Sequence, residues 1–419
     1  MSNQNYDVIV IGGGLAGCGA ALAAARNGAK TLLVERINAL GGAPCTMGVN
    51  PFMPYKTRDP ETGEVIPLSR GIFAELENNL REAGAMYHNA FNAEWMKIIL
   101  NRMMLASGVE LLFNSVAASV EREGDRITSL TVSNKSGLVK LSASYYIDCT
   151  GDADVAMLAD FPYRLGRPGD QLCQPMTLCF QICNVDPEKF NEVQPTIIPK
   201  WQEEHKKGYI KNPMTEIMVF HTPIPSVVQL NATRIVKKNP TDCWELTQAD
   251  IEAREQIVEL YTFLRKFIPG FENCHIVNSA PQTGVRESRM IDGEYVLSAE
   301  EMKDCVRYPD RIATGNYDID IHNPEGSGTS HYFFPQGQYY TIPYRSLIPK
   351  NAENLLVAGR CISATHEAQA SIRILPIVCT LGEAAGTAAA LAVKANCNVK
   401  EVDIPTLQQT LTDAGAFIG

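Results

Sequence analysis

The chain has 419 residues, of which 45% are hydrophobic and 20% are charged, and its formal net charge at pH 7 is −10. A single hydrophobic core rarely grows to this size, so two domains are expected. The acidic balance argues against nucleic acid as a partner, and no run of 18 apolar residues predicts a membrane span. The first strand leaves no room for a signal peptide, so we expect a cytoplasmic protein.

The 12 cysteines form no CxxC pair. Metal sites and disulfide frameworks usually show regular cysteine spacing, which is missing here. We therefore expect reduced thiols and no metal.

The N-terminal segment carries a nucleotide-binding pattern. The apolar run from Val8 to Ile11 predicts a strand buried on both faces, and Gly12-x-Gly14-x-x-Gly17 follows it directly. In this pattern, Gly12 permits a tight turn, Gly14 lets the backbone approach a pyrophosphate, and Gly17 lets a helix pack closely on the strand. The exposed N–H groups of that helix would face the phosphates.

The next elements complete the same unit. An Ala-rich helical segment ends near Gly28, and a second apolar strand, Thr31 to Val34, ends at Glu35. An acid at this place accepts hydrogen bonds from a ribose. The unit alone is compatible with either NAD or FAD.

Two helices and a strand are expected next. Ser69 is a candidate N-cap for a helix with apolar positions from Ile72 to Ala83. Asn92 is a candidate N-cap for a second helix that Gly108 would end. Val109 to Phe113 then predicts another buried strand.

A three-stranded meander is predicted after them. Its strands are Val116–Glu121, Ile127–Val132 and Val139–Ser142, separated by turn signals. The run from Tyr145 to Cys149 predicts a return to a buried strand.

The composition changes at about residue 162, where proline and glycine increase. The alternating run from Pro175 to Ile182 predicts part of an antiparallel sheet. A long amphipathic helix with Thr247 as its cap would end at Pro269. Ser298-x-x-Glu301 is a candidate capping box for a shorter helix. This region is interpreted as a substrate-facing domain.

The C-terminal part returns to the character of a parallel sheet. Asn354 to Ala358 predicts a buried strand ending at Gly359. Proline is favoured in the first turn of a helix, so Pro376 predicts a helix that begins at about Leu375. The small residues between 382 and 390 would let this helix pack tightly against a neighbour.

Several of these segments together resemble FAD-dependent oxidoreductases of the glutathione-reductase-like, two-dinucleotide-binding flavoprotein group. They are the N-terminal glycine motif with Glu35, Ile147-Asp-Cys-Thr-Gly-Asp152, and Leu355-Leu-Val-Ala-Gly-Arg360 followed by the Gly-Glu-Ala-Ala-Gly helix. More narrowly, the runs 284–295, 342–349 and 361–368 resemble a largely uncharacterised FAD-dependent oxidoreductase family. The likeness extends over nearly the whole chain.

The resemblance implies an α/β fold in which a FAD-binding Rossmann-like domain, with a parallel sheet, helices and a β-meander, holds an inserted α+β substrate domain with an antiparallel sheet. The implied limits are 1–161 and 341–419 for the two parts of the FAD-binding domain and 162–340 for the substrate domain.

The resemblance also implies non-covalent FAD. Glu35 would bind the ribose, Arg36 would lie beside the adenine, and Val116 would meet the adenine edge through its backbone. Relatives commonly have aspartate where this chain has Arg360, and an arginine there would pair with a phosphate instead. The full set of implied cofactor contacts is Gly12, Gly14, Leu15, Ala16, Glu35, Arg36, Gly41, Gly42, Thr46, Val116, Thr150, Gly151, Asp152, Gly359, Arg360, Arg373, Ile374 and Leu375.

Four residues are candidates for contact with the flavin or the substrate. His366 lies between the Gly359 strand and the late helix, so it is expected near the flavin as an acid/base or substrate contact, or else as a structural histidine. Arg286 and Arg289 would present one basic face to an anionic substrate, or pair with nearby acids. Arg373 would bind either flavin or substrate.

The predicted function is hydride transfer between flavin N5 and a small, acidic organic substrate. A flavin monooxygenase and a flavoprotein of tRNA modification are the alternatives. No second GxGxxG unit follows, so electrons would pass by substrate exchange, to oxygen, or to a separate electron-transfer partner. The sequence leaves the oligomeric state open, with a homodimer among the options.

Overall fold

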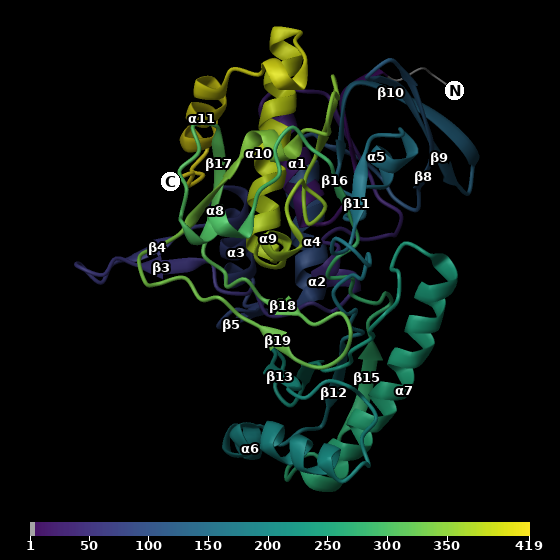
Figure 1. Ribbon diagram of the computed structural model, residues 1–419, viewed down its shortest axis with the longest axis vertical. Coiled ribbons are helices and arrows are strands. Elements are labelled where there is room, and N and C mark those ends of the chain that lie inside the picture. The colour runs from purple at the N-terminus through teal and green to yellow at the C-terminus, as the bar shows by residue number, and fades with distance from the viewer. Residues whose placement is uncertain (1–4) are drawn as a thin grey trace.

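The computed structural model describes residues 5–419 and is built around a seven-stranded sheet (Figure 1). The strand order is β7-β2-β1-β10-β9-β8, with β21 also paired to β10. The bounds are β1 (Asn5–Ile11), β2 (Thr31–Val34), β7 (Glu110–Leu112), β8 (Val116–Glu123), β9 (Arg126–Asn134), β10 (Gly137–Asp148) and β21 (Leu355–Val357).

The central strands are parallel and buried on both faces. β1 pairs in parallel with β2 and β10, and β21 and β7 extend the parallel arrangement on either side. Alternate side chains of β1 enter different cores: Val8 and Val10 belong to one, Ile9 and Ile11 to the other. This two-residue alternation explains why the whole run is apolar.

Helices α1 (Leu15–Arg26) and α10 (Leu375–Ala395) pack against each other within the core that Val8 and Val10 enter. Both are rich in small residues, so their backbones approach closely, as predicted for the 382–390 segment. α10 begins at the predicted Leu375. Two further helices join this core, α3 (Ile72–Glu82) and α4 (Ala93–Ala106).

By length and composition α10 is apolar enough to cross a membrane. However, 89% of the apolar stretch is buried inside the molecule. The apolar character of α10 is therefore accounted for by its place in the core.

Two strand predictions are corrected. The last meander strand and the returning buried strand are one continuous element, β10, which pairs with β9 near its start and with β1 and β21 further along. Within the predicted run from Val109 to Phe113, β7 covers Glu110–Leu112, and these three side chains are exposed or only partly buried. β7 lies at the edge of the sheet, and an edge strand has a neighbour on only one side.

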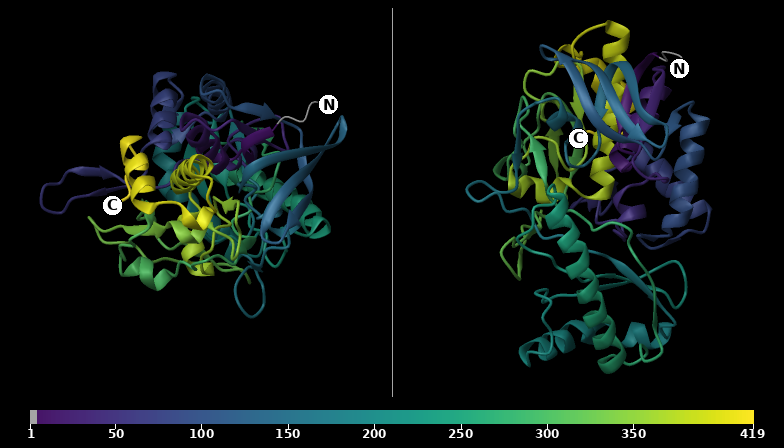
Figure 2. Two further views of the ribbon diagram at one scale, coloured as in Figure 1. Left: turned by 90° about the horizontal axis from the view of Figure 1, so that it is seen from above. Right: turned by 90° about the vertical axis from the view of Figure 1, so that its right-hand side faces the viewer.

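A second sheet lies below the first in Figure 1, and Figure 2 shows the same separation from the side. It is antiparallel, with the order β13-β14-β12-β15. Two helices pack with it around a separate hydrophobic core. The bounds are β12 (Phe180–Cys183), α6 (Pro187–Lys206), β13 (Met218–His221), β14 (Val228–Asn231), α7 (Cys243–Phe267) and β15 (His275–Ser279).

This second core draws on residues between 176 and 285, whereas residues 297–348 pack in the first core. An inserted unit with an antiparallel sheet is thus consistent with the structure. The domain limits at 161/162 and 340/341 stay a prediction.

The helix ends differ in part from their predicted positions. Asn92 caps α4 and Ser298 and Glu301 form the capping box, as predicted. α7 begins four residues before Thr247, because Asp242 accepts the first free N–H groups. Ser69 does not cap α3, whose N-cap residue is Gly71. The sequence does not predict α6, because two prolines, Pro195 and Pro199, lie in its interior.

The remaining elements are short or lie near the C-terminus. They are α2 (Ala43–Thr46), β3 (Lys56–Arg58), β4 (Val65–Pro67), β5 (Met86–Tyr87), β6 (Ala90–Phe91), α5 (Asp154–Leu158), β11 (Tyr163–Leu165), β16 (Arg289–Ile291), α8 (Ala299–Lys303), β17 (Arg311–Gly315), β18 (Ile321–His322), β19 (Thr329–Ser330), β20 (Tyr340–Pro343), α9 (His366–Ile372) and α11 (Ile404–Asp413).

Candidate active site

A cavity of ≈ 640 Å³ lies where β1, β2 and β10 end and extends to the antiparallel sheet, where Met218 and Asn231 line it. The carboxyl edge of a parallel sheet is the usual ligand site in this architecture. Most of the predicted site residues line this cavity: Gly12, Gly14, Leu15, Ala16, Glu35, Arg36, Gly41, Gly42, Thr46, Thr150, Gly151, Arg286, Gly359, Arg360, Arg373, Ile374 and Leu375.

The N-terminus of α1 opens into the cavity. Gly14 is its N-cap, no side chain caps it, and its first turn contains no acidic residue. Its free N–H groups therefore remain available to an anion. A side chain at Gly12 would lie 2.4 Å from the carbonyl oxygen of Cys149, so the turn requires glycine there.

The loop that contains Gly41 and Gly42 lies against this turn. Gly42 has φ of 62°, and a Cβ there would lie 2.6 Å from the Cα of Gly14. The two backbones can approach this closely only because residue 42 has no side chain. The cavity wall here consists of exposed main chain.

Glu35 lies at the end of β2 and is buried. Its Oε2 accepts a hydrogen bond from Gly13 N at 2.5 Å, and its Oε1 accepts one from Ile37 N at 3.0 Å. These bonds fix the carboxylate at the cavity wall. Beside it, Arg36 donates to Gln282 Oε1 at 3.0 Å.

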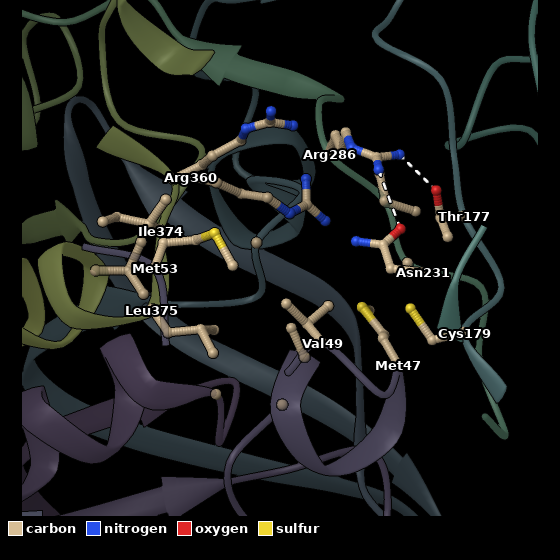
Figure 3. Close-up of a pocket in the computed structure, with 18 of the residues that line it drawn as sticks. Met47, Val49, Met53, Thr177, Cys179, Asn231, Arg286, Arg360, Ile374 and Leu375 are labelled. Carbon is tan, nitrogen blue, oxygen red and sulfur yellow. Dashed lines mark hydrogen bonds between the residues drawn. The ribbon is translucent and has the colours of Figure 1, made fainter. Parts of the chain in front are cut away.

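The N-terminus of α10 also opens into the cavity. Ile374 is the N-cap, without a side-chain cap, and Pro376 lies in the first turn. Figure 3 shows Ile374 and Leu375 beside Val49 and Met53, which form an apolar wall. An apolar wall beside free N–H groups suits a flat ring with polar edges.

Arg360 is held from the side opposite the cavity. Its Nη2 lies 2.6 Å from Asp152 Oδ1, and its Nη1 donates to Ser288 Oγ at 2.6 Å. Asp152 does not line the cavity, so it acts there through Arg360. The predicted direct contact between Asp152 and the cofactor stays a prediction.

Three arginines enclose the other end of the cavity. Arg286 donates to Pro175 O at 2.7 Å, to Thr177 Oγ1 at 2.6 Å and to Asn231 Oδ1 at 3.5 Å (Figure 3). Burial, together with nearby Arg373, lowers the pKa of Arg286 to about 10, which leaves it protonated at neutral pH.

The other two arginines differ in their partners. Arg234 donates to backbone carbonyls of the 323–328 loop. Arg373 lies 3.5 Å from Asp320. Within residues 5–419, neither Arg234 nor Arg286 has a carboxylate within 4.0 Å, so this end of the cavity is electropositive.

Asp320 is the carboxylate among these arginines. Its Oδ2 accepts from Tyr317 Oη at 3.1 Å and lies 3.3 Å from His322 Nε2. Burial lowers the pKa of His322 to about 3, with a contribution from Arg286, so this imidazole is neutral. Burial opposes ionisation of Asp320, but His322 and the arginines hold its pKa well below its ordinary value.

Two of the three predicted catalytic side chains do not line the cavity. His366 is buried and its Nδ1 lies 2.7 Å from Glu287 Oε1, a fully buried carboxylate. Arg289 forms an ion pair with Asp154 at 2.8 Å. Both residues thus have the acidic partners of the structural alternative stated for them, and a role of either residue toward the flavin or the substrate stays a prediction.

Val116 is also outside the cavity. It is the first residue of β8, and its side chain is half exposed. The predicted contact between its backbone and the adenine edge stays a prediction. Ile37 and Gln282, which the sequence did not indicate, line the cavity beside Glu35 and Arg36.

Comparison with known proteins gives the cofactor class. The sequence model of the FAD-dependent oxidoreductase family matches residues 7–411. The chain belongs to this family. It is therefore an FAD-dependent oxidoreductase, and the sheet, α1 and α10 form its FAD-binding Rossmann-like fold.

Three proteins of known name are similar to this chain. A digeranylgeranylglycerophospholipid reductase of Picrophilus torridus is 31% identical over 161 residues, which are 35% of this chain and 39% of that protein. A tRNA uridine 5-carboxymethylaminomethyl modification enzyme of Lactococcus lactis subsp. cremoris is 55% identical over 47 residues, which are 11% of this chain and 8% of that protein. Both matches thus span less than half of the curated relatives. A crystal structure of a geranylgeranyl bacteriochlorophyll reductase-like protein of Thermoplasma acidophilum aligns with a TM-score of 0.47 at 13% identity, covering 98% of this chain and 83% of that one.

The residues that line the cavity fit FAD in their chemistry. The uncapped N-terminus of α1 beside Gly42 suits the diphosphate, and Glu35 suits a ribose hydroxyl. The free N–H groups of α10 and the apolar wall beside them suit the flavin ring. When bound, FAD supplies a hydride donor or acceptor.

Reasoning from the sequence missed the residues that complete the electropositive end. Asn231, Arg234, Tyr317, Asp320 and His322 all line the cavity. Asp318 and Asp320 precede β18 and lie outside any strand, so no periodic pattern in the sequence indicated that Asp320 and His322 would line the cavity. Oxygen and nitrogen atoms of Asp318, Asp320 and His331 also lie within 4.8 Å of one another.

Proposed function

We propose that this oxidoreductase exchanges hydride between FAD and a small organic substrate that carries a carboxylate. Arg286 is the observation that carries the proposal. Its guanidinium is enclosed, faces the same cavity as the Gly14 turn, and has no carboxylate partner within residues 5–419.

The physical reason is the cost of buried charge. An enclosed cation that lacks a counterion is unfavourable, and Arg286 shares its surroundings with Arg234 and Arg373. Of these three arginines, Arg373 is the one with a carboxylate, that of Asp320, within 4.0 Å in the described residues. A substrate carboxylate would supply the missing negative charge and form charge-assisted hydrogen bonds.

The other residues around Arg286 hold its guanidinium in place and exclude water from the adjacent space. Thr177 and Asn231 fix the guanidinium of Arg286, so its free N–H groups point in one direction. Val49, Met53 and Leu375 keep the adjacent space apolar. An oriented substrate in a dry site is what hydride transfer requires from the protein.

The test compares carboxylic acids with their neutral amides. Each compound is mixed anaerobically with the FAD-loaded protein, and loss of the oxidised-flavin absorbance is followed with time. We expect acids to bind and reduce the flavin, and amides to do neither. In Arg286→Met, apparent affinity for the acids should fall by roughly 10- to 100-fold, since a hydrogen bond to a charged group contributes about 1.5–3 kcal/mol.

The control is Arg254→Met, which removes an exposed arginine of α7 far from the cavity and should behave as wild type. Equal responses to acids and amides, or an unaffected Arg286→Met protein, would contradict the proposal. Flavin reduction by NADPH with rapid oxygen consumption, and no response to the acids, would favour a monooxygenase instead. Bound flavin is quantified in every variant so that loss of cofactor is not mistaken for loss of substrate binding.

A further inference from the structure

One wall of the cavity is formed by a face of the antiparallel sheet. Met218 of β13 and Asn231 of β14 are directly opposite each other in the register of these strands, and both line the cavity. Residues paired in this way project from the same face of a sheet, with Cβ atoms about 5 Å apart. Because Asn231 accepts a hydrogen bond from Arg286, Met218 lies one strand away from the residue that contacts the guanidinium.

The opposite wall is the loop that follows α2. Gln229 Nε2 donates to Gly48 O at 3.0 Å, and a Cβ at Gly48 would lie 3.0 Å from Cys179 Cβ, so this loop lies against the sheet. Met47 and Val49, on either side of Gly48, line the cavity, and Figure 3 shows Met47 beside Cys179. The cavity therefore continues between the loop and the sheet.

The far part of this space adjoins α6. Trp201 Nε1 donates to Met214 O at 2.6 Å and Gln202 Nε2 donates to Thr215 O at 3.2 Å, so α6 lies against the segment that leads into β13. Ile198 of α6 lines the cavity together with Met214. Apolar side chains therefore continue along the cavity from β13 to α6.

The apolar side chains of this wall are not fully covered by protein. Met47, Ile198 and Met218 are each partly exposed where they line the cavity. Contact between water and such a surface is unfavourable, so an apolar ligand group that displaced the water would bind favourably. The residues that fit FAD lie at the α1 turn, at Glu35 and at the start of α10, which leaves the wall on β13 and α6 to the substrate.

We propose that the substrate is a monocarboxylic acid with an extended apolar chain, whose carboxylate binds Arg286 and whose chain lies along Met218 toward Ile198. This inference rests on the proposed function and specifies its substrate class. Arg286 supplies the positive charge that the carboxylate requires, and the apolar wall begins one strand away from its partner Asn231. The unbranched side chains of the methionines adapt to the shape of such a chain.

A second carboxylate at the end of the chain fits this site poorly. Glu216 lines the cavity in the segment before Met218, and its side chain is exposed. A terminal carboxylate would approach this like charge, and its desolvation beside apolar side chains would cost free energy. A dicarboxylic acid is therefore an outcome of the test rather than part of the proposal.

The experiment is a calorimetric titration of FAD-loaded protein with butanoate, hexanoate, octanoate and decanoate at several temperatures. We expect each two added methylene groups to tighten binding by roughly tenfold until the chain reaches α6. The heat-capacity change of binding should become more negative along the series, because it reports burial of apolar surface. Octanedioate, which has the length of octanoate but a carboxylate at both ends, should lose most of the gain.

Ile198→Gln should weaken octanoate binding by roughly tenfold and leave butanoate binding unchanged, because the short chain does not reach α6. Met218→Gln, closer to the carboxylate, should weaken hexanoate binding as well. Val258→Gln is the matched control, since it changes an exposed apolar residue of α7 that does not line the cavity. Arg286→Met should weaken all four acids by a similar factor and keep the dependence on chain length. Bound FAD and the melting temperature identify any variant that has failed to fold.

The outcomes separate this inference from the proposed function. If the acids bind equally whatever their length, or if octanedioate binds as tightly as octanoate, the apolar-chain assignment is wrong and the carboxylate proposal stands. An unchanged dependence on chain length in both Ile198→Gln and Met218→Gln also overturns the assignment. If octanamide binds as tightly as octanoate, the carboxylate proposal is wrong, whereas the apolar wall keeps its role. If no acid binds, both are wrong.

Discussion

Glu383 is a residue whose ionisation is coupled to folding. It lies in α10, is 2% exposed, and its Oε2 accepts a hydrogen bond from Ile72 N at 3.0 Å, at the start of α3. The carboxyl group is thus the cap that Ser69 was predicted to provide. Burial raises the pKa of Glu383 to about 7, although the Ile72 N–H and Arg26 act in the opposite direction.

This raised pKa predicts a pH-dependent stability. In the unfolded chain Glu383 ionises near its ordinary value of about 4.3, so between that pH and 7 the folded state binds the extra proton. The stability of the folded state relative to the unfolded state therefore decreases as pH rises from about 4.3 to 7, and the loss is complete above 7. Glu383→Gln, which cannot ionise, should lack this loss.

The measurement is the free energy of unfolding by urea at pH 5 and pH 8 for wild type and Glu383→Gln. We expect the variant to gain roughly 1–3 kcal/mol relative to wild type between these two pH values. Glu82→Gln, at the exposed end of α3, is the control and should show no such gain. A constant difference between wild type and Glu383→Gln at both pH values would contradict the argument.

The contact between α1 and α10 is the main helix pairing next to the cofactor site. A Cβ at Gly382 would lie 1.9 Å from Ala16 O, and one at Gly386 would lie 2.0 Å from Ala20 O. No backbone can accept an atom at that distance, so each added methyl group would push the two helices apart. Because both helices begin at the cavity, their spacing sets the distance between the diphosphate and flavin ends of the site.

Gly386→Ala should destabilise the protein by about 1–3 kcal/mol and weaken FAD retention. Its methyl group has no flexible side chain to displace, only the backbone of Ala20. Gly326→Ala is the control, because a Cβ there meets no atom within 4 Å. The two measurements are thermal unfolding and the flavin content after gel filtration. If Gly386→Ala and Gly326→Ala gave the same unfolding temperature and flavin content, α1 and α10 would tolerate separation, which would contradict the prediction.

At the scale of the whole molecule, the cavity is assembled from segments that are far apart in the chain. Gly12 to Thr46, Thr150 and Gly151, the region around Arg286, and Gly359 to Leu375 all contribute to it. A ligand that contacts all of these segments stabilises their mutual arrangement, since it binds the folded state alone.

Removal of FAD should therefore destabilise more than the N-terminal motif. FAD that binds only the folded state raises the free energy of unfolding. At a free FAD concentration about a hundredfold above the dissociation constant, this increase is about 2.7 kcal/mol. Hydrogen exchange on FAD-loaded and FAD-free protein should show added protection at residues 12–17, 41–46 and 359–375 together. Protection confined to residues 12–35 would contradict the placement of the flavin at α10, and NAD serves as the control ligand.

The sequence determined the nucleotide half of the protein. Apolar runs buried on both faces, glycines at fixed spacing and a proline in the first turn of a helix are local signals, and they located β1, the Gly14 turn and the start of α10. The family match then fixed FAD as the cofactor. These features depend on backbone conformation, which neighbouring residues largely specify.

Only the tertiary structure decided the substrate half. His366 and Arg286 look similar as isolated polar residues, yet Glu287 holds His366 outside the cavity while Arg286 faces into it. Arg234 and Asp320 come from segments about 90 residues apart and meet only because the antiparallel sheet packs beside the loop that contains Asp320. The spacing of residues along the sequence does not predict such a contact, because tertiary packing determines which side chains are buried and which charged groups lie close together.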